Sequence, residues 1–266
     1  TQSLQGRSPG LFIRDVQGMP GEDDIELNIR GYGNPLIVVD GTEVSTTYFQ
    51  QLESEDIESI NILKDASAAA VYGARAGNGV IIVETKRGTV GAPSFNFNTR
   101  TGYQYFTAAP DFLSSAEYAE MENVARMVAG KDPMYSQEDI DRYRSGTDPD
   151  YPSTDWWNEV FKETSPSYEG NLSVRGGTEK VQYFISGSYY QQRGFLESDD
   201  IKNEKYSFRN NLDVSITDKL SLGLDLSLTN QDFIAPPVGN VQGNIMRIHR
   251  ANPTMKVYGD GGRAGH

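Results

Sequence analysis

The residues that most often perform chemistry in proteins are scarce in this chain. It contains two histidines, His249 and His266, and no cysteine. Neither the Gly-x-Ser-x-Gly nucleophile elbow nor the zinc motif His-Glu-x-x-His occurs. A hydrolytic triad would have to use His249, which follows the last expected strand. The sequence therefore predicts no catalytic residue and no enzyme activity.

Two further patterns could bind a ligand, and both have a simpler interpretation. Gly73, Gly77 and Gly79 are not spaced as Gly-x-Gly-x-x-Gly, and no Lys-Ser/Thr pair follows them, so they predict a tight turn. The acidic segments 148–150 and 199–200 could chelate calcium but lack the spacing of an EF-hand loop. We interpret them as solvated loop charges, and we expect no metal and no cofactor.

Composition narrows the class of protein. Asp and Glu number 37 against 24 Lys and Arg, which gives a net charge of −13, so the chain repels phosphate backbones and no nucleic-acid partner is expected. No apolar run approaches the ~18 residues of a membrane-spanning helix. Mean hydropathy is −0.55 with 11% aromatic residues, too apolar for a disordered chain. Membrane β-barrels remain allowed, because their alternating strands average to a polar composition.

Period-two alternation predicts strands along much of the chain. Residues 1–90 read as a small α/β unit, with short apolar strands at 25–29, 36–39, 60–63 and 80–83. Alternation returns at 95–105 and then at about 168–176, 180–191, 205–217 and 219–231. The last strand is the clearest, because leucine alternates there with small polar residues. Its apolar face is predicted to carry Leu220, Leu222, Leu224, Leu226 and Leu228.

The connections between these strands alternate between short and long. Strands 168–176 and 180–191 are joined by a short turn, as are strands 205–217 and 219–231, whereas the other connections are long. The longest, residues 106–167, has helical patterns near 114–129 and 136–143, the first capped by Ser114 or Ser115. Up-and-down membrane barrels have such connections, with short periplasmic turns and long external loops.

Aromatic residues gather at one end of the expected strands. Tyr189 and Tyr190 end one strand, and Tyr206 and Phe208 begin the next. All four are expected near the external end, as in an interfacial aromatic girdle. The alternative is ordinary cross-strand aromatic packing in a soluble sheet.

Specific motifs give a family resemblance. Residues 56–88 contain LKDASA followed by YGARAGNGV, and this segment resembles the plug domain of SusC/RagA-type TonB-dependent outer-membrane transporters. Other matching pieces follow in family order across nearly the whole chain. They are LQGRSPG at 4–10, NIRGYGNPLIVVDG at 28–41, LSSAEY at 113–118, TDWWNEVF at 154–161, NLSVRGGTEKVQYFISGSYYQQRG at 171–194 and NPTMKVYGDGG at 252–262.

The resemblance implies a transmembrane antiparallel β-barrel, 22-stranded in the family, closed by an N-terminal α/β plug. Residues 1–90 would be the C-terminal part of the plug, and residues 91–266 the first five or so barrel strands with an extracellular excursion at 106–167. Five strands cannot close a membrane barrel, so the chain is expected to be a fragment, a partly described protein or one piece of a split barrel.

The resemblance also implies a function and partners. The function would be TonB-dependent import of a large nutrient, an oligosaccharide or oligopeptide, across the outer membrane of a Gram-negative, Bacteroidota-like cell. The partners would be a SusD-like surface lipoprotein that lids the barrel, TonB acting through a segment absent from this chain, and outer-membrane lipid. The alternatives are a surface-attached β-rich binding or adhesin module and, least favoured, a periplasmic glycan enzyme.

The resemblance also leads us to expect roles for individual residues. Arg30 and Lys64 are expected to hold the plug to the barrel wall, and Tyr32, Gly33 and Asn34 to meet substrate. The five leucines of 220–228 are expected to face lipid, with polar residues such as Asn210, Asp213 and Asp225 facing the lumen. Trp156-Trp157 could stack on a sugar ring, although the resemblance favours a structural anchor near the membrane surface.

Overall fold

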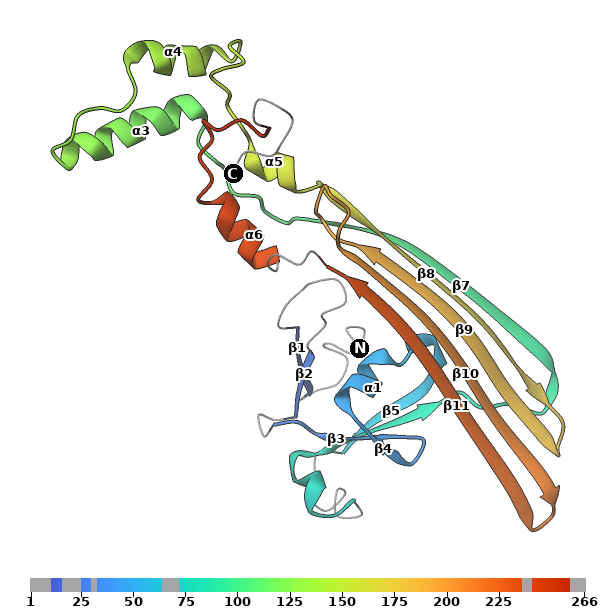
Figure 1. The fold of residues 1–266 in the computed structure, drawn as a ribbon. Helices are drawn as coiled ribbons and strands as arrows, with labels where there is room; N and C mark the ends of the chain where they lie inside the picture. Colours follow the sequence, from blue (N-terminus) through green and yellow to red (C-terminus); the bar gives the residue numbers. More distant parts are fainter. Residues whose placement is uncertain (1–10, 16–24, 30–32, 64–71, 236–240, 259–266) are drawn as a thin grey trace. The chain divides into compact units, whose positions relative to one another are not determined.

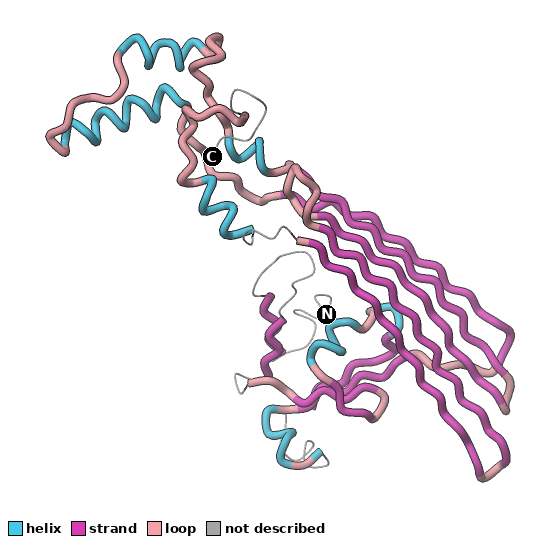
Figure 2. The backbone as a smooth tube through the Cα atoms, viewed as in Figure 1, coloured by secondary structure: helices cyan, strands magenta, loops and turns pink. Residues whose placement is uncertain are grey.

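The structure, a computed structural model, describes residues 11–15, 25–29, 33–63, 72–235 and 241–258. These residues form two compact units, which are described separately. The first contains residues 1–102, 166–193 and 202–234, and the second contains residues 103–165, 194–201 and 235–266. Figure 2 shows that strands dominate the first unit and helices the second.

The N-terminal part of the first unit, residues 11–90, is an α/β region built on a four-stranded sheet (Figure 1). Its strand order is β4-β3-β6-β5, with β3 and β6 parallel and the outer pairs antiparallel. A separate antiparallel pair, β1 and β2, precedes it. The elements are β1 Leu11–Asp15, β2 Ile25–Ile29, β3 Leu36–Val39, β4 Thr42–Val44, α1 Thr46–Gln51, η2 Ser54–Asp56, β5 Ile57–Leu63, η4 Ala74–Asn78 and β6 Val80–Thr85.

The two central strands of this region form its core. β3 and the first four residues of β6 are continuous apolar runs, as expected of parallel strands covered on both faces. One face packs with Phe49 of α1, and the other packs with Ala76 of η4. Ser45 caps α1 by accepting a hydrogen bond from the backbone N–H of Tyr48 at 3.1 Å. The structure confirms the predicted short strands at 25–29, 36–39, 60–63 and 80–83, with small extensions.

The rest of the first unit is a five-stranded antiparallel sheet that the chain builds strand after strand, in the order β11-β10-β9-β8-β7. The predicted strands are confirmed and extend by several residues at some ends. The predicted short turns are confirmed too, since two residues separate β10 from β11 and three separate β8 from β9. The bounds are β7 Gly91–Tyr105, β8 Thr164–Gly177, β9 Val181–Arg193, β10 Lys202–Thr217 and β11 Leu220–Ile234.

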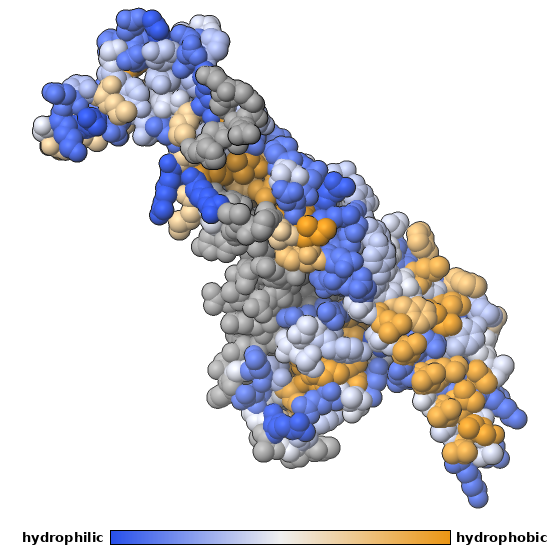
Figure 3. Space-filling view, viewed as in Figure 1, coloured by the Kyte–Doolittle hydropathy of each residue, from blue (hydrophilic) through white to orange (hydrophobic). Residues whose placement is uncertain are grey.

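The two faces of this sheet differ in chemistry. Leu220, Leu222, Leu224, Leu226 and Leu228 of β11 are all exposed, at 42–58% of their surface. The register pairs Leu224 with Leu212 and Leu222 with Val214, so the apolar face continues onto β10. Figure 3 shows apolar side chains gathered along these strands. The opposite face of the sheet carries buried polar residues, including Asn171, Ser186, Arg209 and Asn211.

The register corrects two expectations about faces. Asn210 is paired with Leu226 and Ile185, so it lies on the leucine face and not with the lumen-side polar residues as expected. Tyr190 lies on the polar face, because it neighbours Tyr189 in one strand and successive side chains alternate. Tyr189 and Tyr206 are directly paired on the leucine face, with ring centroids 4.9 Å apart.

The second unit is mainly helical. Its helices are α3 Ser115–Val128, α4 Gln137–Ser145, α5 Trp156–Val160 and α6 Val241–Ile248. Ser114 caps α3 in a reciprocal capping box with Glu117, and Ser136 caps α4 in the same way with Asp139. Both predicted helices are thereby confirmed. None of the helices in the described residues is long and apolar enough to cross a membrane.

The hairpin between β8 and β9 gives a first prediction. Gly177 has φ +149°, and a Cβ there would lie 2.3 Å from the Val181 carbonyl oxygen. Gly177→Ala is expected to destabilise the protein by about 1–3 kcal/mol through backbone strain, and the clash adds to this cost. Gly170→Ala on the same strand meets no atom within 4 Å and is the matched control. Thermal loss of the β-sheet circular-dichroism signal measures both; equal midpoints would contradict the prediction.

Candidate functional site

The α/β region is joined to the polar face of the five-stranded sheet by a small set of polar contacts, some of them buried and some partly exposed. The first centres on Asn211 of β10, which is fully buried. Its side-chain amide donates hydrogen bonds of 2.8 Å to the Thr85 hydroxyl and to the Lys86 carbonyl. Asp40 holds Thr85 from the other side, accepting from its backbone N–H at 2.9 Å and its hydroxyl at 2.7 Å. The end of β6 is thus fixed between Asp40 and the sheet.

Arg87, just after β6, makes the second contact. Its guanidinium donates to both carboxylate oxygens of Asp225 on β11, at 2.5 and 2.7 Å. Asp213 and Asp40 lie 3.6 and 3.9 Å away. The hydrogen bond to Asp225 is the main cause that raises the pKa of Arg87. This two-point pairing fixes the orientation of the linker as well as its position.

The third contact lies further along β10 and joins it to the segment around η2. Lys205 pairs with Glu53 at 2.9 Å, and the Ser207 hydroxyl donates to the same carboxylate at 2.8 Å. Next to it, Arg209 lies 3.4 Å from Asp56, and both side chains are only 5% exposed. Burial raises the pKa of the Asp56 carboxyl, while a hydrogen bond with Ser186 and the charge of Arg209 oppose that shift.

Gly88 makes the closest backbone approach between the linker and the sheet. A Cβ at this position would lie 2.1 Å from the Tyr183 backbone nitrogen and 2.9 Å from the Gln182 Cβ. Only glycine allows the chain to pass here, directly before β7 begins.

Several buried polar atoms on this side of the sheet have no hydrogen-bond partner among the described residues. They are Asp56 Oδ1, Arg209 Nε, Asn211 Oδ1, Ser188 Oγ and both side-chain atoms Nδ2 and Oδ1 of Asn171. Each unmet buried group costs on the order of 1–3 kcal/mol. The contact is therefore made of specific hydrogen bonds and ion pairs, and some of its buried polar atoms are unpaired.

The contacts described above are made by residues that the sequence analysis did not single out for this role, and the expected plug–barrel role of Arg30 and Lys64 stays a prediction. Arg30, Lys64 and Tyr32 lie outside the described residues. Gly33 has φ +101°, and the Asn34 carbonyl accepts a 3.4 Å hydrogen bond from the Asn78 side chain. The substrate role of Tyr32, Gly33 and Asn34 stays a prediction. Of the residues expected to face the lumen, Asp213 and Asp225 lie on the side of the α/β region, facing Arg87.

The tryptophan pair and the acidic loops are engaged within the second unit. Trp157 is 9% exposed and packs on Phe106 and Phe161, with centroids 4.9 and 4.8 Å away. Trp156 donates its indole N–H to the Asn252 carbonyl at 3.0 Å. This packing favours the structural role over sugar stacking. Lys256 pairs with Asp150 at 2.7 Å, and Lys162 pairs with Asp199 at 2.6 Å. Within the described ranges, no three His, Asp or Glu side chains gather to hold a metal ion.

Comparison with known proteins agrees with this architecture. Residues 1–80 match the TonB-dependent Receptor Plug Domain family. TonB-dependent receptor P26 of Formosa agariphila is 34% identical over 98% of this chain and 26% of its own length. TonB-dependent receptor SusC of Bacteroides thetaiotaomicron is 28% identical over 96% of this chain and 25% of its own length. The chain thus spans about a quarter of the curated relatives it matches.

A solved structure shows the same fold. The RagAB peptide importer in its closed-closed state superposes with a TM-score of 0.70 at 26% identity, over 87% of this chain and 29% of that chain. The α/β region and the antiparallel sheet are thus those of a plugged β-barrel receptor. The protein belongs to the TonB-dependent receptors, a family of the outer membrane of Gram-negative bacteria. Within that family it is of the SusC/RagA type.

The buried pair of Asp56 and Arg209 gives the second prediction. Arg209→Met leaves the carboxyl of Asp56 buried without its cation, which is expected to weaken docking of the α/β region by about 3–5 kcal/mol. Replacing both partners, Asp56→Leu with Arg209→Met, is expected to recover much of the loss. The measurement is the urea concentration at which protease first cleaves within residues 33–90 of the full-length receptor.

Arg100→Met is the control for this prediction. Arg100 pairs with Glu169 at 3.0 Å, but its side chain is 70% exposed, so the loss should stay below about 1 kcal/mol. Equal effects of Arg209→Met and Arg100→Met would contradict a buried polar lock. A double variant in which the α/β region is docked more weakly than in Arg209→Met alone would contradict it too.

Proposed function

We propose that this chain forms the plug and the leading wall strands of an active importer in the outer membrane of a Gram-negative, Bacteroidota-like bacterium. The plug is the α/β region, and the wall is the five-stranded sheet. The importer would move a large nutrient, an oligosaccharide or an oligopeptide, when TonB supplies force to the plug. No step of this function needs covalent chemistry on the chain.

The observation that carries the proposal is the opposite chemistry of the two wall faces. The face on the plug side is polar and partly desolvated, whereas the other face exposes five leucines on β11 alone. A soluble protein rarely leaves so large an apolar surface in water. A barrel strand in lipid requires this arrangement, with apolar side chains outward and polar side chains inward.

The dimensions of the leucine face fit a bilayer. From Tyr206, which pairs with Tyr189, to Thr217, which pairs with Leu220 beyond a register shift at Ile216, β10 advances by about ten residues. At roughly 3.3 Å per residue and a tilt near 45°, they span about 25 Å, close to the height of the apolar band of such barrels. We therefore propose that Leu220, Leu222, Leu224, Leu226 and Leu228 face lipid, with the tyrosine pair at the outer boundary.

The polar contact between plug and wall supports gating by plug movement. The ion pairs and hydrogen bonds that hold the plug to this part of the wall can be exchanged for hydrogen bonds to water when the plug moves. Substrate would arrive from outside beneath a SusD-like lipoprotein lid and meet the plug near Tyr32, Gly33 and Asn34. The name of the RagAB peptide importer supports the import of peptides by a relative.

The third prediction tests the lipid-facing assignment. Leu224→Arg places a charge at mid-depth and is expected to cost roughly 2–4 kcal/mol of stability in a bilayer. Ile234→Arg is the matched control, because it lies on the same face of β11 but beyond the tyrosine pair, where the cost falls to about 0–1 kcal/mol. Folding titrations in lipid vesicles measure both. Equal costs at the two depths would show that Leu224 does not face the bilayer core.

The fourth prediction tests gating. Ser207 and Glu53 lie within hydrogen-bond distance across the plug–wall contact, and the chain has no native cysteine. In the full-length receptor, Glu53→Cys with Ser207→Cys, joined by a short bis-methanethiosulfonate linker, should tether the plug and abolish nutrient uptake. A reductant should restore uptake, and each single variant with the reagent should transport normally. Normal uptake with complete cross-linking would contradict gating by plug displacement.

A further inference from the structure

The second unit contains a cleft of about 600 Å³ that none of the roles above uses. It lies between the segment that enters α3 and the segment that carries α5. This volume falls within the range of small-ligand sites, roughly 300–1,000 Å³. The lining residues are Phe106, Ala109, Pro110, Asp111, Phe112, Leu113, Ser114, Glu117, Ser153, Thr154, Asp155, Trp157, Asn158 and Glu163.

Part of the cleft lining is aromatic and held in place by ring contacts. Phe106 packs against Trp157, Phe161 and Phe195, with ring centroids 4.9, 5.4 and 4.4 Å away. Trp157 is almost fully buried, so its faces are occupied by protein. Phe112 and Leu113, also in the lining, stay 38% and 49% exposed, and the ring of Phe112 meets that of His249 edge-on, with centroids 5.3 Å apart. A ligand can therefore pack an apolar stem against Phe112 and Leu113, but it cannot stack on Trp157.

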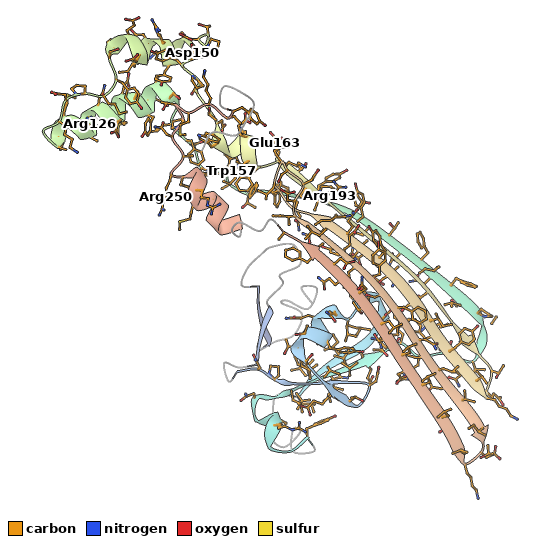
Figure 4. All side chains as sticks on the ribbon, viewed as in Figure 1. Arg126, Asp150, Trp157, Glu163, Arg193 and Arg250 are labelled. Atoms are coloured by element: carbon orange, nitrogen blue, oxygen red, sulfur yellow. The ribbon has the colours of Figure 1, made fainter. Side chains whose placement is uncertain are left out.

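All the charged residues that line the cleft are acidic. The lining contains the four carboxylates of Asp111, Glu117, Asp155 and Glu163, and no Lys, Arg or His. Glu117 and Asp155 cap α3 and α5, and hydrogen bonds from Ser114 lower the pKa of Glu117. Asp111 and Glu163, in contrast, make no hydrogen bond or ion pair with any described residue. Figure 4 labels Glu163 just beyond Trp157 along the chain.

The donors that line the cleft are largely engaged. The Asn158 side chain donates to Asp155 at 2.7 Å, and the Thr154 hydroxyl donates to the Met255 carbonyl at 2.6 Å. The cleft therefore offers mainly acceptors, and the complementary ligand is rich in donors. A guanidinium carries five donors, no acceptor and a permanent positive charge. A neutral sugar presents as many acceptors as donors and lacks the charge.

We propose that this cleft binds a basic side chain of a peptide, an arginine above all. Its guanidinium pairs with the carboxylates of Asp111 and Glu163, and its aliphatic stem packs on Phe112 and Leu113. Glu117 and Asp155 add negative potential while they hold the two helices. The site concerns equilibrium binding to the receptor and does not depend on transport.

Calorimetric titration of the purified full-length receptor in detergent tests the proposal. The probe is the blocked tripeptide Ac-Ala-Arg-Ala-amide, and its control carries citrulline, which keeps the shape and loses the charge. The arginine peptide should bind at least tenfold more tightly than the citrulline peptide. Its affinity should fall as ionic strength rises.

Variants locate the site. Asp111→Asn with Glu163→Gln should weaken arginine binding at least tenfold and leave circular dichroism unchanged, since both side chains are exposed and unpaired. Glu159→Gln on α5, an exposed residue outside the cleft, should change the affinity less than twofold. Equal binding of the two peptides, no binding of the arginine peptide, or full affinity in the double variant would each overturn the proposal.

Discussion

The structure depends on hydrogen-bond and ion-pair partners for the polar side chains on one face of β9, β10 and β11. Side chains such as Arg209 and Asn211 cannot be withdrawn from water without partners, because an unpaired buried polar group is costly. The α/β region supplies those partners through Asp56, Thr85 and Lys86. The plug is thus the hydrogen-bonding complement of the wall, and its docking allows the inner face to stay polar.

The same constraint explains the outer face. Successive side chains of a strand point to opposite faces, so polar residues on the inner face leave the outer positions free to be apolar. On β11, leucine occupies five successive outward positions. Neither a second sheet nor a helix in the described part of the first unit covers these leucines, and they stay exposed. The plug-side polarity and the outer leucines are therefore two results of one pattern, and both are needed for a plugged barrel in lipid.

The sequence predicted the strands and missed the contacts between plug and wall. The leucine face of β11 was predictable because one face is uniformly apolar. On β10, Phe208, Leu212 and Val214 set the alternation that puts Asn210 on the leucine face, but Asn210 was assigned to the lumen by its polarity and was placed wrongly. The pairs Asp56–Arg209 and Arg87–Asp225 join residues more than a hundred positions apart. Nothing local marks such partners, since charged residues are common on both elements.

The central claim is that alternate residues of β11 face lipid and a plugged lumen. Spin labels placed singly at positions 220 to 228 of the full-length receptor, reconstituted in lipid vesicles, test it most directly. The account predicts that even-numbered positions are accessible to lipid-soluble oxygen and that odd-numbered positions are not. Oxygen accessibility that is uniform along the strand, or highest at the odd-numbered positions, would contradict it.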